Sequence, residues 1–121
     1  MLERLKKRRD FLAAARGFKA ARGSFVLEMR RREDDGPARF GFTVSKRTAK
    51  KAVERNRIRR RLKEGVRLVA PEHARPGRDY VLVGRREALT EPFALIRAAL
   101  ADALERAAAQ SGRAGARRSG R

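Results

Sequence analysis

A strongly basic helix between two predicted strands constrains this chain more than any other feature. Residues 45–64 contain ten lysines and arginines but only two glutamates. Beginning at Ile58, apolar or small residues recur at helical spacing as far as Val69. This pattern predicts one long helix that begins near Thr48 and packs its apolar stripe on a sheet. Arg57, Arg60, Lys63 and Arg67 lie on the opposite side, and Arg55 is expected near the stripe, at the rim between sheet and helix. The predicted stripe consists of Ile58, Leu62, Gly65, Val66 and Val69.

The unbalanced charge of this helix indicates a polyanionic partner. Charged faces that are merely solvated usually mix both signs, whereas this segment repels itself unless an anion lies against it. Arg55, Asn56 and Arg57 provide planar hydrogen-bonding groups suited to phosphates and base edges. The whole chain is also basic, with 33 Lys+Arg against 14 Asp+Glu in 121 residues and a net charge of +19. We therefore expect a nucleic acid as the partner.

Length and composition predict a single domain. We expect a nucleic-acid-binding domain over residues 1–109, with a basic arm at 1–9 and a disordered basic tail at 110–121. The chain has no cysteine, which excludes disulfides and thiolate metal sites. It also lacks a signal-peptide pattern and any apolar run of about 20 residues. We expect a cytoplasmic protein.

Three segments before the basic helix have clear local patterns. Asp10 is the expected cap of a short helix that stops at Gly17. Residues 25–30 and 39–45 are predicted strands, and the turn chemistry of residues 34–37 predicts that they form a hairpin. In the second strand one face is bulky and apolar, as expected for core, and the other is a small polar floor for something bound. The bulky face carries Phe40, Phe42 and Val44, and the small face Gly41, Thr43 and Ser45.

The end of the chain adds a strand and a helix. Residues 71–78 break the helical pattern, and residues 79–85 read as a mostly buried strand, which completes a strand–helix–strand unit. The last helix is predicted to start at residues 90–92 and to serve as scaffold, because its apolar stripe is clean. That stripe consists of Phe93, Ile96, Leu100, Leu104 and Ala107.

The order of these motifs resembles the protein subunits of bacterial ribonuclease P. The resemblance covers roughly residues 5–107, and its specific part is Arg55-Asn56-Arg57 with flanking cations, preceded by Val44-Ser45-Lys46. The other matching motifs are Asp10-Phe11, Phe25-Val26-Leu27, Gly41-Phe42-Thr43, Ala52-Val53-Glu54 and a strand ending Gly84-Arg85.

The resemblance implies a specific α+β fold. It is a two-layer α-β-β-β-α-β-α sandwich related to a ribosomal-protein domain, with the basic helix in a left-handed βαβ crossover. General chirality rules alone would predict the right-handed crossover.

The resemblance also implies a function in transfer-RNA maturation. In this family a holoenzyme with endoribonuclease activity removes the 5′ leader from precursor transfer RNA. Its RNA subunit performs the catalysis, with Mg²⁺ held mainly by that RNA. The protein, inactive alone and without catalytic or metal-binding residues, lowers the magnesium requirement and broadens substrate use. The implied partners are ribonuclease P RNA and the precursor's 5′ leader, with no membrane and no obligate protein partner.

Two sets of RNA-binding residues follow from the resemblance. Phe11 is the first candidate for stacking a leader base and Phe25 the second. Family members often carry another aromatic residue where this chain has Ala14-Ala15, so Phe18 or Phe25 could replace it. The catalytic-RNA set is Arg55, Asn56, Arg57, Arg59, Arg60, Lys63, Lys50 and Lys51, and the leader set is Phe11, Phe25, Thr43, Ser45 and Lys46.

Simpler interpretations compete with these assignments. Without the resemblance, Phe11 and Phe25 are more readily core residues. Asp34 and its neighbour fit a turn better than a metal site, and His73, the one histidine, fits a surface loop. The alternative function is a structural RNA-binding protein of ribosomal or assembly type. A nuclease acting alone would need a convergent base or metal site, which the sequence does not reveal.

Overall fold

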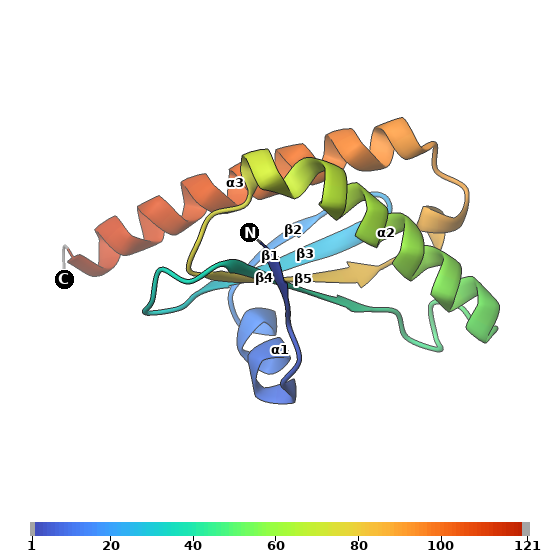
Figure 1. The fold of residues 1–121 in the computed structure, drawn as a ribbon, viewed down its shortest axis with the longest axis horizontal. Coiled ribbons are helices and arrows are strands. Elements are labelled where there is room, and N and C mark those ends of the chain that lie inside the picture. Colours follow the sequence, from blue (N-terminus) through green and yellow to red (C-terminus); the bar gives the residue numbers. More distant parts are fainter. Residues whose placement is uncertain (1, 120–121) are drawn as a thin grey trace.

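The computed structural model describes the backbone of residues 2–119 and the side chains of residues 2–110. It contains five strands, three α-helices and one short 3-10 helix (Figure 1). In chain order these are β1 (Leu2–Arg4), α1 (Arg8–Ala15), β2 (Phe18–Ala21), β3 (Phe25–Arg31), β4 (Ala38–Thr43), α2 (Ala52–His73), β5 (Arg78–Gly84), η1 (Arg86–Leu89) and α3 (Phe93–Ser119).

The five strands form one mixed sheet in the order β1-β4-β5-β3-β2. The central strand β5 pairs parallel with β4 and antiparallel with β3. Consecutive residues Tyr80, Val81 and Leu82 of β5 are all buried. A strand whose two faces are both apolar must be covered on both sides, which explains its central position.

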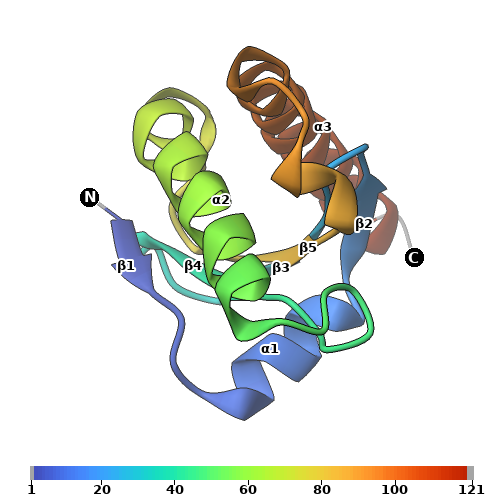
Figure 2. The ribbon, with the colours of Figure 1, turned by 90° about the vertical axis from the view of Figure 1, so that its right-hand side faces the viewer.

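Helices cover both faces of the sheet. Helices α2 and α3 lie together on one face, and α1 lies against the other (Figures 1 and 2). The α2–α3 layer and the sheet form the predicted sandwich, and β4–α2–β5 is the predicted strand–helix–strand unit because β4 and β5 are parallel neighbours. The α+β class is confirmed, and the left hand of the crossover stays a prediction.

The main core lies between the sheet and the α2–α3 layer. The predicted apolar stripe of α2 is buried, as is that of α3 apart from the half-buried Phe93. Gly65 brings the two helices close together, since a Cβ there would lie 2.6 Å from Cδ1 of Leu100. On the sheet side, Phe40 and Tyr80 stack with ring centroids 4.8 Å apart.

The predicted hairpin of residues 25–30 and 39–45 is wrong, although both strands exist. Strand β5 lies between β3 and β4, and β3 forms its hairpin with β2, a strand that the residue patterns did not predict but that the fold implied by the resemblance includes. The intervening loop is tied to the start of β5, because Gly77 N–H donates to Gly36 O at 2.7 Å and Arg32 N–H to Gly77 O at 2.8 Å. The turn residues 34–37 therefore belong to a connection between two strands that are not neighbours in the sheet.

The basic helix begins later and ends later than predicted. Residues 45–48 form a turn, in which Thr48 N–H donates to both the carbonyl and Oγ of Ser45, and α2 starts only at Ala52. Pro71 was expected to break the helix but lies inside it. A proline removes one backbone hydrogen bond, and so close to the end the last turn still closes, with Ala74 N–H donating to Ala70 O at 2.8 Å.

The two ends of the chain also differ from the predictions. The expected basic arm contains β1, which pairs parallel with β4, and α1 starts at Arg8 with Asp10 in its first turn rather than as its cap. Helix α3 is assigned to Ser119, past the point where the tail of residues 110–121 was predicted to become disordered. The side chains after Gln110 and the last two positions lie outside the described residues.

Candidate nucleic-acid interface

The cations of residues 45–64 lack acidic partners. Six of them lie on α2, and the other four precede it in the loop after β4. Within residues 2–110, none of the ten has a nitrogen within 4.0 Å of a carboxylate oxygen. The charge is therefore available to an external anion.

The two glutamates of this segment pair with other arginines. Glu64 accepts two hydrogen bonds from Arg67, at 3.0 and 2.6 Å, and these lower the pKa of Glu64. Glu54 lies 3.4 Å from Arg86. Both carboxylates thus neutralise cations outside the ten, which leaves the basic segment unbalanced.

Arg55 has an internal role that the sequence analysis did not predict. Its Nη1 donates to the carbonyl oxygens of Ala49 and Lys50, both at 2.8 Å, and the side chain is half-buried. Arg55 therefore ties the preceding loop to the first turns of α2. The side chains of Lys50 and Lys51 in this loop are exposed.

Of the remaining predicted cations of α2, Arg57, Arg60 and Lys63 are exposed and Arg59 is half-buried. Arg57 and Arg60 make no hydrogen bond or ion pair within the described part of the chain, and both are exposed. Arg59 Nη2 donates to Asn56 Oδ1 at 2.8 Å, which orients both side chains. The Lys63 ammonium lies 5.9 Å from the ring centroid of Phe42, a cation–π geometry. The guanidinium groups of Arg57 and Arg60 are therefore open to solvent.

Phe11 lies on the face of the sheet that α1 covers. It rests directly on Gly41, since a Cβ at Gly41 would be 2.4 Å from Phe11 Cε1. Both residues line a hollow of about 420 Å³ together with Phe42, Arg59 and Lys63. The hollow is at the sheet edge, where β1 ends and β4 continues. Residues predicted to serve two different RNAs therefore border one space.

The assignment of Phe25 to the leader cleft is contradicted by its burial. Its side chain is 0% exposed and belongs to the main core beneath α2 and α3. It shares a face of β3 with Leu27 and Met29, and Phe18 lies opposite Met29 on that same side. Neither Phe18 nor Phe25 faces α1, so neither supplies a second aromatic beside Phe11.

The other predicted leader residues occupy different local settings. Thr43 is exposed and aligned with Val83, a residue of the small core under α1, so Gly41 and Thr43 share the face predicted as a floor. Ser45 lies beyond the end of β4, where its hydroxyl is engaged with Thr48 at 3.1 Å. Lys46 is exposed.

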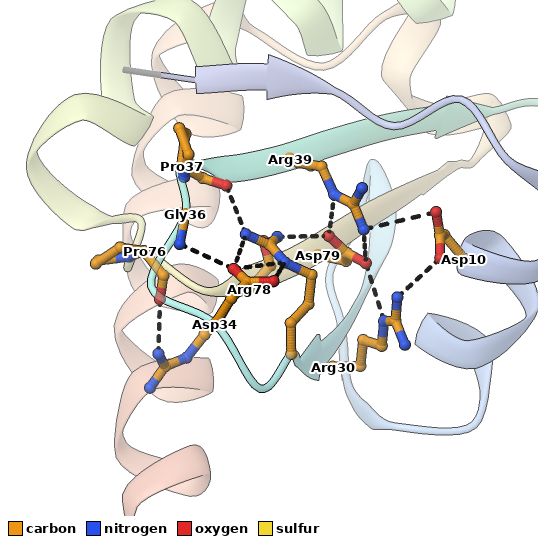
Figure 3. A network of polar contacts seen from close by, with 10 residues as sticks. Asp10, Arg30, Asp34, Gly36, Pro37, Arg39, Pro76, Arg78 and Asp79 are labelled. Carbon is orange, nitrogen blue, oxygen red and sulfur yellow. Dashed lines mark hydrogen bonds and ion pairs between the residues drawn. The ribbon is translucent and has the colours of Figure 1, made fainter.

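An ionic network under α1 was missed by the sequence analysis. Asp79 is 0% exposed and accepts hydrogen bonds from Arg30, Arg32 and Arg39 (Figure 3). Burial alone would raise the pKa of Asp79, but the hydrogen bonds from its three arginine partners outweigh burial and lower it. The sequence did contain a signal for this network. Asp79 begins a predicted strand that is otherwise mostly apolar, and a buried charge needs partners.

The alternative interpretations of Asp34 and His73 can be compared with their contacts. Asp34 Oδ1 accepts from the Gly36 N–H at 2.8 Å, which confirms turn chemistry, and hydrogen bonds from Arg32 and then Gly36 lower the pKa of Asp34 to about 2. His73 is not in a loop: it ends α2, half-buried, with Nδ1 2.7 Å from Glu105 Oε2 on α3. Over the described residues, no helix combines the length and apolarity needed to cross a membrane.

Comparisons with known proteins identify the family. The ribonuclease P family model matches residues 2–108. The chain is 54% identical over 84 residues to the ribonuclease P protein component of Caulobacter vibrioides, covering 69% of this chain and 56% of that protein's length. It is 47% identical over 113 residues to the corresponding protein of Paramagnetospirillum magneticum, covering 89% of this chain and 84% of the relative.

A solved structure supports the same relationship. The RNase P protein from Thermotoga maritima matches with a TM-score of 0.71 at 30% identity, over 86% of this chain and 96% of that one. The similarity therefore extends through sheet, helices and sequence together. The chain belongs to the ribonuclease P protein family.

Proposed function

We propose that this chain is the protein subunit of a ribonuclease P ribonucleoprotein that removes the 5′ leader from precursor transfer RNA. One observation carries the proposal: ten cations of one segment have no carboxylate partner within residues 2–110. Because the chain belongs to the ribonuclease P protein family, the polyanions proposed to bind this surface are ribonuclease P RNA and precursor transfer RNA. The catalytic RNA performs the chemistry, and the protein binds and positions.

The α2 surface is the proposed docking site for the catalytic RNA. Guanidinium groups bind phosphate oxygens through two parallel hydrogen bonds, so Arg57 and Arg60 neutralise charge where RNA strands approach one another. The same neutralisation would otherwise be left to Mg²⁺, the ion that the RNA is proposed to hold. The protein therefore lowers the magnesium concentration at which the holoenzyme is active and broadens the substrates it accepts.

The space beside Phe11 is the proposed site for the single-stranded leader. Unpaired bases expose their faces, and an aromatic ring with nearby cations binds them with little sequence preference. Phe11 supplies the ring, and Arg59 and Lys63 border the same hollow. The Phe11 ring covers Gly41, and the exposed Thr43, two residues further along β4, leaves the adjacent floor free of a bulky side chain, so that a strand can approach there.

Reconstitution tests the proposal. The protein is mixed with a bacterial ribonuclease P RNA, and cleavage of a precursor transfer RNA is measured over a magnesium titration. Efficient cleavage is expected at a lower magnesium concentration than the RNA alone requires, and the protein alone should cut nothing. RNA binding without any change in the magnesium titration would instead favour a structural RNA-binding protein.

Phe11→Ala tests the leader site. Losing one stacked base weakens binding by about 1–3 kcal/mol, or about fivefold to 150-fold. The loss should appear for a leader-bearing precursor and be absent for mature transfer RNA, both measured as dissociation constants of the holoenzyme. Leu12→Ala on the exposed side of α1 is the matched control and should change neither value. Equal losses for both ligands would contradict the assignment of Phe11.

A further inference from the structure

Three neighbouring strands place a row of charges beneath α1. Arg30 of β3 and Arg39 of β4 each lie directly opposite Asp79 of β5, so the three side chains project from one face of the sheet. Asp79 accepts from Arg30 Nε at 2.9 Å and from Arg39 Nε and Nη2 at 2.7 and 2.8 Å. The two guanidiniums are thereby held rigidly on either side of a buried carboxylate.

Helix α1 attaches to this row through a second carboxylate. Asp10 Oδ1 accepts from Arg30 Nη2 at 2.8 Å, and its Oδ2 lies 3.5 Å from Arg39 Nη2 (Figure 3). Asp10 is buried although it belongs to a short surface helix. It therefore bridges both arginines and anchors the first turn of α1 to β3 and β4 at once.

The next residue after this anchor is Phe11. Arg39 binds Asp10, and two residues further along the same strand Gly41 supports the Phe11 ring. Alternate residues of a strand lie about 6.7 Å apart on one face, so Arg39 and Gly41 both face α1. Strand β4 thus sets the position of Asp10 and the position of Phe11 together.

Little else holds α1 in place. The apolar cluster under it has only Leu5, Ala14 and Val81 fully buried, with Phe11 and Val83 at its edge. A helix of eight residues is not stable in isolation. Its first turn also carries Arg8 and Arg9, cations that the helix dipole disfavours at an amino terminus. The ionic anchor therefore has a large share in fixing the helix.

We propose that Asp10 is a positioning residue for leader recognition, which holds Phe11 at the sheet by bridging Arg30 and Arg39. This inference rests on the proposed function, because it deepens the role of the Phe11 site. Asp10 does not touch the leader itself. Its contribution is to keep the stacking ring at one distance from the floor, so that binding a base does not have to order α1 first.

Another carboxylate of the same ionic network, that of Asp34, provides a control for the substitution of Asp10. Arg32 also binds Asp79, at 2.8 Å, but its other carboxylate partner is Asp34 in the loop between β3 and β4. Asp34 makes no hydrogen bond or ion pair with α1 within the described residues. Asp34→Asn therefore removes one carboxylate charge from the same network without releasing α1.

Holoenzyme binding gives the functional test. Asp10→Asn keeps the side-chain size and removes the charge, and it should reduce the preference for leader-bearing precursor over mature transfer RNA by about tenfold. Asp34→Asn should leave that preference unchanged. In a Phe11→Ala background, Asp10→Asn should have no further effect, because the two residues act through one ring. Additive losses, or equal losses for precursor and mature transfer RNA, would overturn the proposal and make Asp10 a structural residue only.

A measurement without RNA separates this inference from the proposed function. A fluorinated phenylalanine incorporated at position 11 reports the environment of the ring by ¹⁹F NMR. Asp10→Asn should shift and broaden the resonance, and Asp34→Asn should not. An unchanged resonance in Asp10→Asn would overturn the positioning role even if the wild-type holoenzyme prefers the leader. A shifted resonance in a protein with no leader preference would uphold the positioning and reject the leader site.

Discussion

At the scale of single residues, Asp79 is the shared counter-ion of three neighbouring arginines on the sheet. Asp79→Asn would leave those guanidiniums partly buried without their common counter-ion. Removing one partner from a buried ionic network costs about 3–5 kcal/mol, and the partial exposure of Arg30 and Arg39 places this case near the lower end. We expect about 3 kcal/mol less unfolding free energy, measured by urea denaturation at pH 7. The exposed Asp34→Asn control should lose clearly less.

The lowered pKa of Asp79 predicts that the stability of the fold depends on pH. The pKa of Asp79 is lowered in the folded state from its ordinary value of 3.8, so its stabilising contribution is complete above that value. It is lost as the pH falls through 3.8 toward the lower folded pKa. Urea denaturation between pH 7 and pH 3 should show wild-type stability falling more steeply at the acid end than that of Asp79→Asn. Parallel curves would contradict this role of Asp79.

A substitution at Gly41 tests the contact between β4 and the Phe11 ring. A Cβ at this position would lie 2.4 and 2.5 Å from Cε1 and Cζ of the ring, so Gly41→Ala must displace the ring or the helix. Overpacking of this kind costs about 1–3 kcal/mol, and leader affinity should fall with it. Gly23→Ala is the control, because its nearest neighbour is a glutamate side chain at 3.0 Å that can move. Thermal denaturation and precursor binding check both variants.

At the scale of elements, the contact of α2 with α3 depends on the absence of a side chain at Gly65. Alanine would gain about 1 kcal/mol of helix propensity but would meet Leu100 Cδ1 at 2.6 Å in a closely packed core. We expect Gly65→Ala to be destabilising in the wild type and less so, or even stabilising, in a Leu100→Ala background. A double-mutant cycle of unfolding free energies measures this coupling, and strictly additive effects would contradict the close contact.

The elements most predictable from sequence are those whose own pattern decides their burial. The stripes from Ile58 on α2 and from Ile96 on α3 repeat over several turns, and the apolar run of β5 needs two covered faces, so all three were predicted correctly. Strand β2 was missed because its four residues have little pattern of their own and are stabilised by pairing with β3. Strand β1 likewise depends on β4 for its partners.

The candidate site was predictable in its charges and less so in its geometry. A run of cations without carboxylates is visible in the sequence, whereas the hydrogen bonds of Arg55 to Ala49 and Lys50 depend on where the loop folds back. The face that Phe25 occupies follows from the sheet, since a strand residue is core or cleft according to which side the helices cover. Asp10 was read as a cap because its long-range partner Arg30 is twenty positions away.

At the scale of the whole molecule, many of the ion pairs and the basic segment lie toward opposite ends. Several of the described carboxylates pair near the loop between β3 and β4 or along α3, among them Asp34, Asp79 and Glu105. In Figure 1 that loop lies toward the end where α3 terminates, and the amino-terminal end of α2 lies at the opposite end. The ion pairs near the β3–β4 loop support the fold, and the opposite end carries the cations of the proposed RNA-binding surface.

This division predicts the salt dependence of RNA binding. Each cation that neutralises a phosphate contributes about one to the slope of log affinity against log salt, so Arg57→Ala/Arg60→Ala should reduce the slope by about two. The control is Glu64→Gln/Arg67→Gln on the same helix, which removes an ion pair and leaves net charge unchanged. Affinities for ribonuclease P RNA measured from low to moderate salt give both slopes. Equal slopes for the wild type and Arg57→Ala/Arg60→Ala would mean that the catalytic RNA docks elsewhere, because a cation that touches no phosphate releases no counterion.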